Sequence, residues 1–420
     1  MTERAAALLE AIFGGSFRRD FGVRLWDGST LASTTGRTDF TLVVNEPGAL
    51  RTAFTPPLER NAGAIFAAGS LDVEGDLTAA IARINDAANA RRSPLRTARI
   101  ALRMLRLPRE RRPVPPGAHL HGKLHSRARD RAAISYHYDH PVGFYRSFLD
   151  RDMVYSCAYY DDGIDDLESA QQAKLEYVLR KLRLEAGMSF LDIGCGWGSL
   201  VIAAARRGAN ALGITLSRVQ YEEANRRIAE LGLSERARVE FRDYRDLGAA
   251  SFDRIASIGM VEHVGRAMLP VYYESAFRAL RPGGLFLNHG IAEQSPGRKP
   301  PPNLFIERYV FPDGDLVAVA DSLAVAERAG FEIRDVENLR EHYARTLRAW
   351  VTNIERNREQ AIALAGETAY RVWRLYMAGS AVSFDAASIG VYQSLLARPR
   401  SSGEVTIPPT RRDLYSSPSA

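Results

Sequence analysis

One stretch constrains the fold of this chain more than any other: a short apolar run that ends in three glycines at alternate positions. Residues 190–193, Phe-Leu-Asp-Ile, suit a parallel strand that is buried on both faces. Gly194, Gly196 and Gly198 follow it and would let the backbone approach a ligand where the next helix begins, over residues 199–207. The spacing differs from the G-x-G-x-x-G pattern of dinucleotide-binding proteins. The stretch predicts a ligand site at a strand end, although a strand-to-helix turn without a ligand would carry the same pattern.

Strand and helix patterns alternate regularly on both sides of this turn. The expected strands cover residues 210–214, 237–241, 252–258, 285–289 and 331–336, with a last one within 381–396; the expected helices include residues 217–232 and 268–280. Repeated β-α units predict an α/β fold with a doubly wound, mostly parallel sheet. In such folds ligands bind outside the carboxyl ends of the strands.

The first third of the chain has a different character. Residues 21–30 alternate in polarity and lead into an Asp-Gly turn, residues 40–44 suit a second strand, and residues 77–90 suit an amphipathic helix. We therefore expect a small α+β accessory domain over residues 1–108. A basic linker follows over residues 109–130, then the main domain over residues 131–398 and a disordered tail over residues 399–420.

A basic helix closes the small domain. Prolines bracket residues 94–108, and Arg96, Arg99, Arg103 and Arg106 recur on one face of the predicted helix. This pattern is typical of a helix that lies on an anionic membrane surface. A linker helix that packs its apolar side on the protein would show the same spacing.

Composition limits the remaining function classes. The net charge is +6 and the sequence pI is about 9.3, which fits phosphates of nucleic acid or of a membrane surface. Cys157 and Cys195 are the two cysteines and give neither a disulfide framework nor a metal-ligand cluster, as expected for a reducing cytoplasm. We find no apolar run of membrane-spanning length and no signal peptide.

Residues 192–198, Asp-x-Gly-x-Gly-x-Gly, resemble motif I of the S-adenosylmethionine-dependent methyltransferases. Many of these enzymes place an acidic residue after the second strand, where this chain has Thr215-Leu-Ser217 and then Gln220. Six segments resemble the cyclopropane-fatty-acyl-phospholipid synthases: residues 155–159, 191–198, 213–220, 257–265, 288–291 and 308–314. The resemblance spans about residues 131–398 and implies a Rossmann-like class I methyltransferase domain.

The resemblance implies transfer of the methyl of S-adenosylmethionine to the double bond of an unsaturated phospholipid acyl chain. The product of attack is a carbocation, which needs nearby negative charge and a base. In the family that base is a bound bicarbonate ion. The positions that match its binding residues are Cys157, Glu262, His289, Ile291 and Tyr343, of which Tyr343 lies in the loosest match.

The cofactor residues implied by the resemblance follow the same segments. They are Tyr155, Ser156, Gly194, Gly196, Thr215, Leu216, Ser217, Gln220 and Ile258. Tyr138 matches a segment that closes over the site, and Cys195 is expected to pack inside the turn. The resemblance further implies a cytoplasmic enzyme peripherally associated with the inner face of the cell membrane, a homodimer, and a reductase that acts on the product.

Two outcomes of the reaction stay open. Loss of a proton from the added methyl closes a cyclopropane, whereas a hydride shift before that loss leaves an exocyclic methylene. Residues 342–350 and 373–379 look like the actinobacterial branch that makes methylene- or methyl-branched fatty acids. The alternatives are an RNA or small-molecule methyltransferase, against which we find no nucleic-acid-binding module, and a catalytically inactive lipid-binding or scaffold protein.

Overall fold

The computed structural model describes residues 1–13, 19–90, 93–248, 251–294 and 304–415. The chain forms two compact units. The small unit comprises residues 1–118, 302–310 and 354–382, and the large unit comprises residues 119–301, 311–353 and 383–420.

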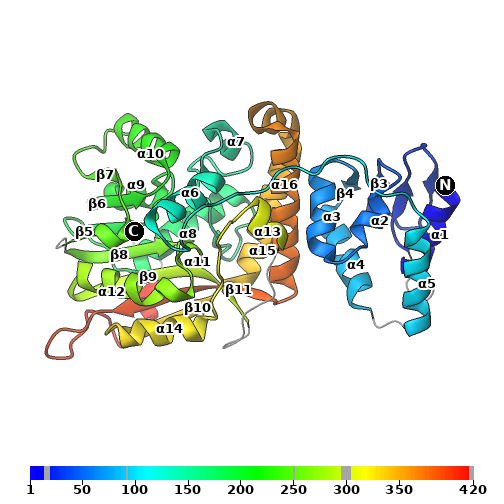
Figure 1. Cartoon of the computed structure of the whole chain (residues 1–420). Helices are drawn as coiled ribbons and strands as arrows, with labels where there is room; N and C mark the ends of the chain where they lie inside the picture. The colour runs from blue at the N-terminus through cyan, green and yellow to red at the C-terminus, as the bar shows by residue number, and fades with distance from the viewer. Residues whose placement is uncertain (14–18, 91–92, 249–250, 295–303, 416–420) are drawn as a thin grey trace. The chain divides into compact units, whose positions relative to one another are not determined.

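A seven-stranded sheet is the centre of the large unit, with the order β10-β11-β9-β8-β5-β6-β7 (Figure 1). The strands are β5 (Ser189–Ile193), β6 (Asn210–Thr215), β7 (Ala237–Phe241), β8 (Phe252–Ile258), β9 (Leu280–Glu293), β10 (Glu332–Asn338) and β11 (Ile389–Ala397). Only β11 pairs antiparallel with its neighbours. The predicted α/β fold with a mostly parallel, doubly wound sheet is confirmed.

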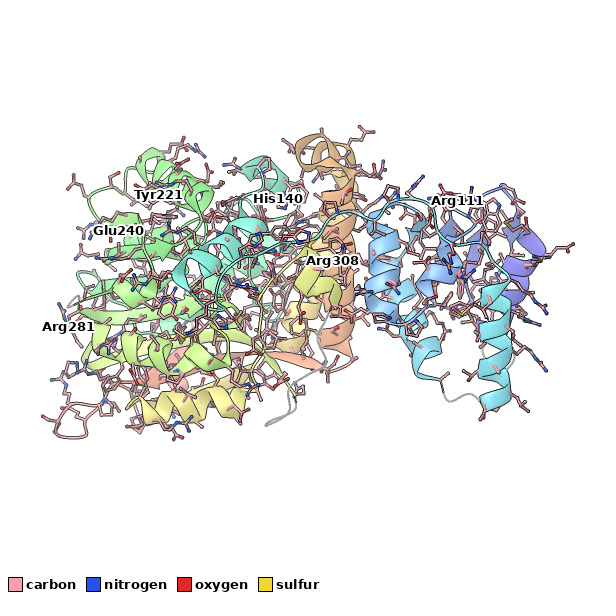
Figure 2. The ribbon with its side chains drawn as sticks, in the orientation of Figure 1. Arg111, His140, Tyr221, Glu240, Arg281 and Arg308 are labelled. Carbon is pink, nitrogen blue, oxygen red and sulfur yellow. The ribbon has the colours of Figure 1, made fainter. Side chains whose placement is uncertain are left out.

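Helices cover both faces of this sheet. They are α6 (Arg127–Tyr138), α7 (Val142–Arg146), α8 (Leu167–Lys181), α9 (Ser199–Arg206), α10 (Arg218–Glu230), α11 (Val261–Val264), α12 (Leu269–Ala279), α14 (Val319–Arg328), α15 (Arg340–Arg356) and α17 (Arg412–Tyr415). Apolar side chains of α8, α9 and α10 pack on one face and those of α12 and α14 on the other. Tyr221 on α10 and Glu240 on β7 lie at the same end of the unit (Figure 2).

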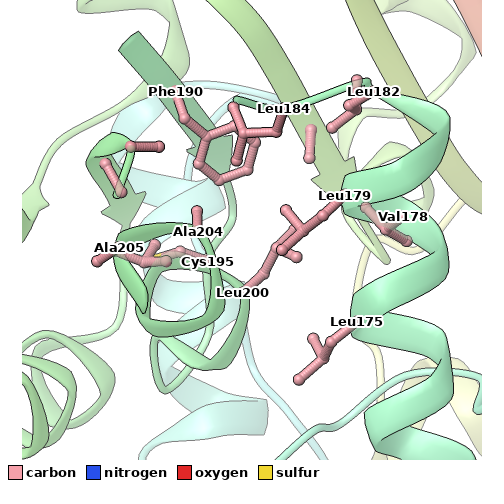
Figure 3. Close-up of a cluster of buried hydrophobic side chains, with 14 of the residues drawn as sticks. Leu175, Val178, Leu179, Leu182, Leu184, Phe190, Cys195, Leu200, Ala204 and Ala205 are labelled. Carbon is pink, nitrogen blue, oxygen red and sulfur yellow. The ribbon is translucent and has the colours of Figure 1, made fainter. Parts of the chain in front are cut away.

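The packing of α8 against α9 and the sheet explains why the glycine turn is held rigidly. Leu175, Leu179 and Leu182 are at most 4% exposed and lie beside Leu200 of α9 and Phe190 of β5 (Figure 3). Burial of each such leucine contributes roughly 1.5–3 kcal/mol. The cluster therefore fixes the strand before the turn and the helix after it.

The small unit is an α+β assembly with a four-stranded sheet of order β2-β1-β3-β4. Its elements are α1 (Thr2–Phe13), β1 (Gly22–Arg24), β2 (Thr30–Leu31), β3 (Phe40–Val44), α2 (Ala49–Ala53), α3 (Leu58–Ala67), β4 (Leu71–Gly75), α4 (Leu77–Asn89), α5 (Pro94–Leu105), α13 (Leu304–Tyr309) and most of α16 (Arg358–Asp385). None of the described helices in either unit is both long and apolar enough to cross a membrane.

This division differs from the predicted domains because two later segments return to the small unit. Arg374 of α16 is buried and donates to Asp72 Oδ1 at 3.2 Å and to Val73 O at 3.0 Å on β4. Phe305 of α13 packs so closely on Gly63 of α3 that a Cβ there would lie 2.3 Å from the Phe305 ring. Both contacts join residues far apart in sequence, so local patterns do not reveal them.

The prediction of a disordered tail is wrong for residues 399–415. Leu414 is 2% exposed and its carbonyl accepts from Arg180 Nη1 at 3.0 Å. Val405 and Ile407 pack on the core of the large unit. Three apolar side chains thus anchor a polar segment whose composition alone indicated disorder. Residues 416–420 lie outside the described residues.

Candidate active site

A cavity opens at the carboxyl ends of β5, β6 and β8, where the strand order reverses direction. All of the predicted cofactor residues except Ser217 line it: Tyr155, Ser156, Gly194, Gly196, Thr215, Leu216, Gln220 and Ile258. Tyr138 lines it too. We call this cavity the donor pocket.

Ser217 shapes the donor pocket without lining it. Its Oγ accepts from the Gln220 N–H at 3.2 Å and caps α10, and it donates to Asp139 Oδ1 at 2.7 Å. N-caps of this kind stabilise a helix by about 1 kcal/mol. Ser217 therefore fixes the start of the helix that carries Gln220.

The glycine turn is left-handed at each of its three glycines, with φ of 79° at Gly194, 54° at Gly196 and 81° at Gly198. This conformation is strained for residues with a side chain. A Cβ on Gly196 would find only one neighbour at 4.0 Å, the amide nitrogen of Gln220. The turn therefore leaves space over the backbone at Gly196. Cys195 packs inward as predicted, against Gly213, where a Cβ would lie 2.7 Å from its Sγ.

Gln220 replaces the acidic residue that many methyltransferases have after the second strand. Thr215 Oγ1 donates to Gln220 Oε1 at 2.8 Å, so the amide oxygen is occupied. The amide NH₂ group remains as a donor beside the glycine turn. A nucleoside hydroxyl beside the glycine turn would accept a hydrogen bond from this NH₂ group through its oxygen.

The donor pocket contains buried ionisable groups that the sequence patterns did not indicate. Lys174 of α8 and Asp192 of β5 both line the pocket, and Lys174 Nζ donates to Ser156 Oγ at 3.0 Å. Burial lowers the pKa of Lys174 to about 8 and raises the pKa of Asp192 to about 7, each opposed by the charge of the other. One sequence pattern could have indicated these groups: Gln171, Lys174 and Lys181 occupy positions of α8 that face the core, where apolar residues are expected.

Tyr138 and His263 lie together at the edge of the donor pocket. Tyr138 Oη and His263 Nε2 are 3.2 Å apart, and the ring of Tyr138 packs edge-on against Trp197. Burial lowers the pKa of His263 to about 4, so the imidazole is neutral at physiological pH. The pair joins α6 to α11 across the pocket, where the sequence predicted a closing segment.

A second, smaller cavity of about 20 Å³ lies next to the first, on the other side of α11. Glu262, Asn288, Gly290, Ile291 and Asp315 are among its lining residues. Glu262 Oε1 accepts from the Ile291 N–H at 2.7 Å, and burial raises the pKa of the Glu262 carboxyl to about 7. Within the described part of the chain, the buried Oε2 of Glu262 has no hydrogen-bond partner.

His289 lies two residues before Ile291 on β9 and is 2% exposed. Its Nδ1 is 3.2 Å from Gln393 Nε2. No described group lies within hydrogen-bond distance of its Nε2. Burial, together with the charges of Lys174 and Lys181, lowers the pKa of His289 to about 3.

Cys157 and Tyr343 meet at Leu339, at the end of β10. Cys157 Sγ is 3.7 Å from Leu339 O, and the Tyr343 N–H donates to the same oxygen at 3.1 Å. Burial raises the pKa of Cys157 strongly, so the residue is a thiol that donates rather than a thiolate. Leu339 N donates to Val391 O, and Val391 is the register partner of Ile291. The structure thus brings the five predicted base-site residues to one end of β9, β10 and β11.

Two short segments supply residues to both places. Tyr155 and Ser156 line the donor pocket, and Cys157 follows them directly. Met260 and His263 line the donor pocket, and Glu262 between them faces the smaller cavity. The two cavities are therefore adjacent parts of one site.

The raised pKa of Glu262 has a consequence for stability. Between about pH 4.5 and about pH 7 the folded protein holds a proton that the unfolded chain has released, so the free energy of unfolding falls as pH rises. At about 1.4 kcal/mol for each pH unit, the loss reaches roughly 3 kcal/mol. In Glu262→Gln, which keeps an acceptor for the Ile291 N–H, we expect this loss to disappear. Urea unfolding at about pH 5 and about pH 8 measures it, and a pH-independent difference between the proteins would contradict the assignment.

Comparison with known proteins places this site in a family. Residues 125–394 match the family described as "Mycolic acid cyclopropane synthetase". A probable fatty acid methyltransferase of Pseudomonas putida is 39% identical over 398 residues, which cover 94% of this chain and 95% of that protein. The cyclopropane-fatty-acyl-phospholipid synthase of Escherichia coli K12 is 36% identical over 263 residues, 62% of this chain and 66% of that protein.

Solved structures agree. The cyclopropane synthase MmaA2 from Mycobacterium tuberculosis superposes with a TM-score of 0.60 at 32% identity, over 64% of this chain and 98% of that one. Mycolic acid cyclopropane synthase CmaA1 complexed with SAH and CTAB gives a TM-score of 0.59 at 34% identity, over 63% and 97%. The chain therefore belongs to the mycolic acid cyclopropane synthetase family of S-adenosylmethionine-dependent methyltransferases.

Proposed function

We propose that this enzyme transfers the methyl carbon of S-adenosylmethionine to the double bond of an unsaturated acyl chain in a membrane phospholipid, and that bicarbonate bound beside Glu262 and His289 is the base. The observation that carries the proposal is the pair of buried polar atoms, Glu262 Oε2 and His289 Nε2, that have no partner among the described residues. Bicarbonate supplies both a hydroxyl for a carboxylate and oxygens for an N–H donor. One small anion of this kind could therefore satisfy both atoms.

Residues around Tyr155 suit a positively charged transition state. The ring of Tyr155 lies 5.1 Å from the ring of Trp350 and 6.3 Å from that of Trp197. Aromatic faces attract cations, by about 0.5–2 kcal/mol each. The same rings exclude water, which would otherwise capture a carbocation. Tyr155 and Trp197 both line the donor pocket, so their rings give it an apolar, cation-stabilising wall.

The proposed reaction is tested by its products. The full-length enzyme is incubated with methyl-labelled S-adenosylmethionine and vesicles of monounsaturated phosphatidylglycerol, with and without bicarbonate, and the released fatty acids are analysed by mass spectrometry. We expect one added carbon per modified chain and a rate that depends on bicarbonate. Double-bond-selective derivatisation separates a cyclopropane from a methylene-branched product of equal mass. Label found in RNA or in a small molecule, but not in lipid, would overturn the proposal.

An acyl substrate in a membrane requires the enzyme to contact a lipid surface. On α5 the side that is exposed for such a contact differs from the predicted arginine face. Arg103 Nη1 donates to Ala7 O at 2.5 Å and Arg96 Nη2 donates to Ala11 O at 3.2 Å, so both arginines lie against α1. Leu95, Leu102 and Leu105 are instead 82%, 59% and 64% exposed. Two of the four arginines of the predicted face are therefore engaged by backbone carbonyls of α1.

We propose that these exposed leucines insert at the membrane surface, with Arg99 and Arg106 beside them on the exposed side of α5 meeting anionic headgroups. Replacing Leu95, Leu102 and Leu105 by Ser should lower binding to phosphatidylglycerol vesicles at least tenfold, because each buried leucine contributes roughly 1.5–3 kcal/mol. Co-sedimentation measures the binding. Exposed Leu231 on the large unit, replaced by Ser, is the control. Unchanged binding of the triple variant would exclude α5 as the docking element.

A further inference from the structure

A row of three polar side chains crosses the sheet beside the proposed base site. Glu337 of β10 is the register partner of Gln393 on β11, and Gln393 is the register partner of His289 on β9. Gln393 and His289 are 1% and 2% exposed. Neither Glu337 nor Gln393 belongs to the segments that indicated the site.

Lys181, the last residue of α8, reaches this row from the helix layer. Its Nζ donates to Gln393 Oε1 at 2.9 Å and forms a close ion pair with Glu337. Tyr177 Oη donates to the same Glu337 oxygen at 3.0 Å. Lys181 is 1% exposed, and Asp335 Oδ2, 3.7 Å from its Nζ, is a further ionic partner.

These contacts determine how the amide of Gln393 is oriented. An ammonium group has donors and no acceptor, so the amide atom that faces Lys181 must be the oxygen. The NH₂ group then faces His289, with Nε2 of Gln393 3.2 Å from Nδ1 of His289. The reverse orientation would place two buried donors against each other and leave the amide oxygen opposite the ring.

The orientation of Gln393 in turn determines the state of His289. A nitrogen that accepts from an NH₂ group carries no proton, so Nδ1 is unprotonated. The only remaining neutral form of the imidazole has its proton on Nε2. That is the ring nitrogen for which no described group is a partner. The ring nitrogen that is buried without a partner among the described residues is thus an N–H.

We infer that Lys181 and Gln393 are positioning residues that hold His289 as the Nε2–H tautomer, so that His289 is a neutral hydrogen-bond donor to an anion and not the base of the reaction. Burial and the charges of Lys174 and Lys181 lower the pKa of His289 to about 3. The imidazole is therefore neutral at physiological pH and is not a charged donor. The inference deepens the proposed function and rests on it for the identity of the anion. The tautomer itself is a property of the free protein.

Nitrogen NMR of histidine-labelled full-length protein reads the tautomer directly. The chain has 8 histidines, and the His289 signals are assigned by their loss in His289→Gln. In the wild type we expect a protonated Nε2 and an unprotonated Nδ1 that do not titrate between about pH 6 and about pH 8. A protonated Nδ1, or an imidazolium, would overturn the inference.

Gln393→Glu provides the matched test of the relay. A carboxylate at this place accepts from both Lys181 and His289, so we expect the proton to move to Nδ1 and the Nε2 signal to become that of an unprotonated nitrogen. Gln393→Met, of similar size, should leave a mixture of both tautomers. Retention of the pure Nε2–H form in both variants would show that Gln393 does not set it.

Bicarbonate titration separates this inference from the proposed function. In the wild type we expect a shift of the Nε2–H signal on addition of bicarbonate, and in Gln393→Glu no such shift. If the tautomer is as inferred and bicarbonate has no effect on signal or rate, the proposed base fails while the positioning role stands. If the rate depends on bicarbonate and Nδ1 carries the proton, the proposed base stands and the positioning role fails.

Discussion

Glu262→Gln is expected to abolish turnover while S-adenosylmethionine still binds. The amide keeps an oxygen for the Ile291 N–H, which Glu262 Oε1 accepts at 2.7 Å, so α11 should stay in place. It cannot take up a proton, and it presents an NH₂ group where the carboxylate presents Oε2. Loss of a group that takes part in proton transfer lowers kcat by about 10²–10⁴-fold. Isothermal calorimetry with S-adenosylhomocysteine and a radiolabel assay on phospholipid vesicles measure the two properties separately.

The chain offers a matched control for this variant. Glu293 is a buried carboxylate on β9, the strand that carries Ile291; it is 5% exposed and pairs with Arg266 at 3.1 Å. It lines neither the donor pocket nor the smaller cavity. Glu293→Gln should therefore keep kcat within a fewfold of the wild type. An active Glu262→Gln enzyme, or equal losses in both variants, would remove Glu262 from the base site.

Gly290→Ala is expected to damage catalysis by displacing Glu262 rather than by removing it. A Cβ on Gly290 would lie 2.2 Å from Val261 Cγ1 and 3.8 Å from Glu262 Oε2. Contacts below 3 Å force a shift, and here the neighbour is a branched side chain on the short helix α11. A displacement of about 1 Å at a reacting group can lower the rate about 10²-fold. We expect a loss of this size in kcat from a steady-state assay.

The contact geometry also predicts which second substitution restores the activity of Gly290→Ala. In the double variant Gly290→Ala/Val261→Ala the atom at 2.2 Å is gone, and the remaining distances of 3.6 Å to Val261 Cβ and 3.8 Å to Glu262 Oε2 are ordinary contacts. The activity of the double variant should return to within a fewfold of Val261→Ala alone. If the double variant is as inactive as Gly290→Ala, the loss arises from strand β9 itself and not from α11.

Local patterns were sufficient to predict the elements that form the donor pocket. The predicted strands over residues 237–241 and 252–258 coincide with β7 and β8, because apolar periodicity and turn residues are properties of short windows. The glycine turn was predictable for the same reason, since its left-handed backbone requires a residue without a side chain.

The relay through Lys181 and Gln393 could not be predicted in this way. Three strands and one helix bring together hydrogen-bonded residues that are 104 to 212 positions apart in the chain, and their register is set by tertiary pairing. The two arginines of α5 show the same limit. Their spacing correctly predicted a helix with both arginines on one face. The carbonyls of α1 that bind them, however, are about ninety positions away in sequence. The sequence pattern thus placed the arginines on one helical face but did not reveal the carbonyls that bind them.

Two segments carry residues of both the donor pocket and the proposed base site, and this has a thermodynamic consequence. Residues 155–157 and 260–263 cannot be reorganised at the donor pocket without moving Cys157 and Glu262. We therefore expect the methyl donor and the anion to bind with a coupling free energy, and by linkage each ligand must change the affinity of the other by the same factor. The departure of the spent cofactor would then change the affinity for the anion by that same factor.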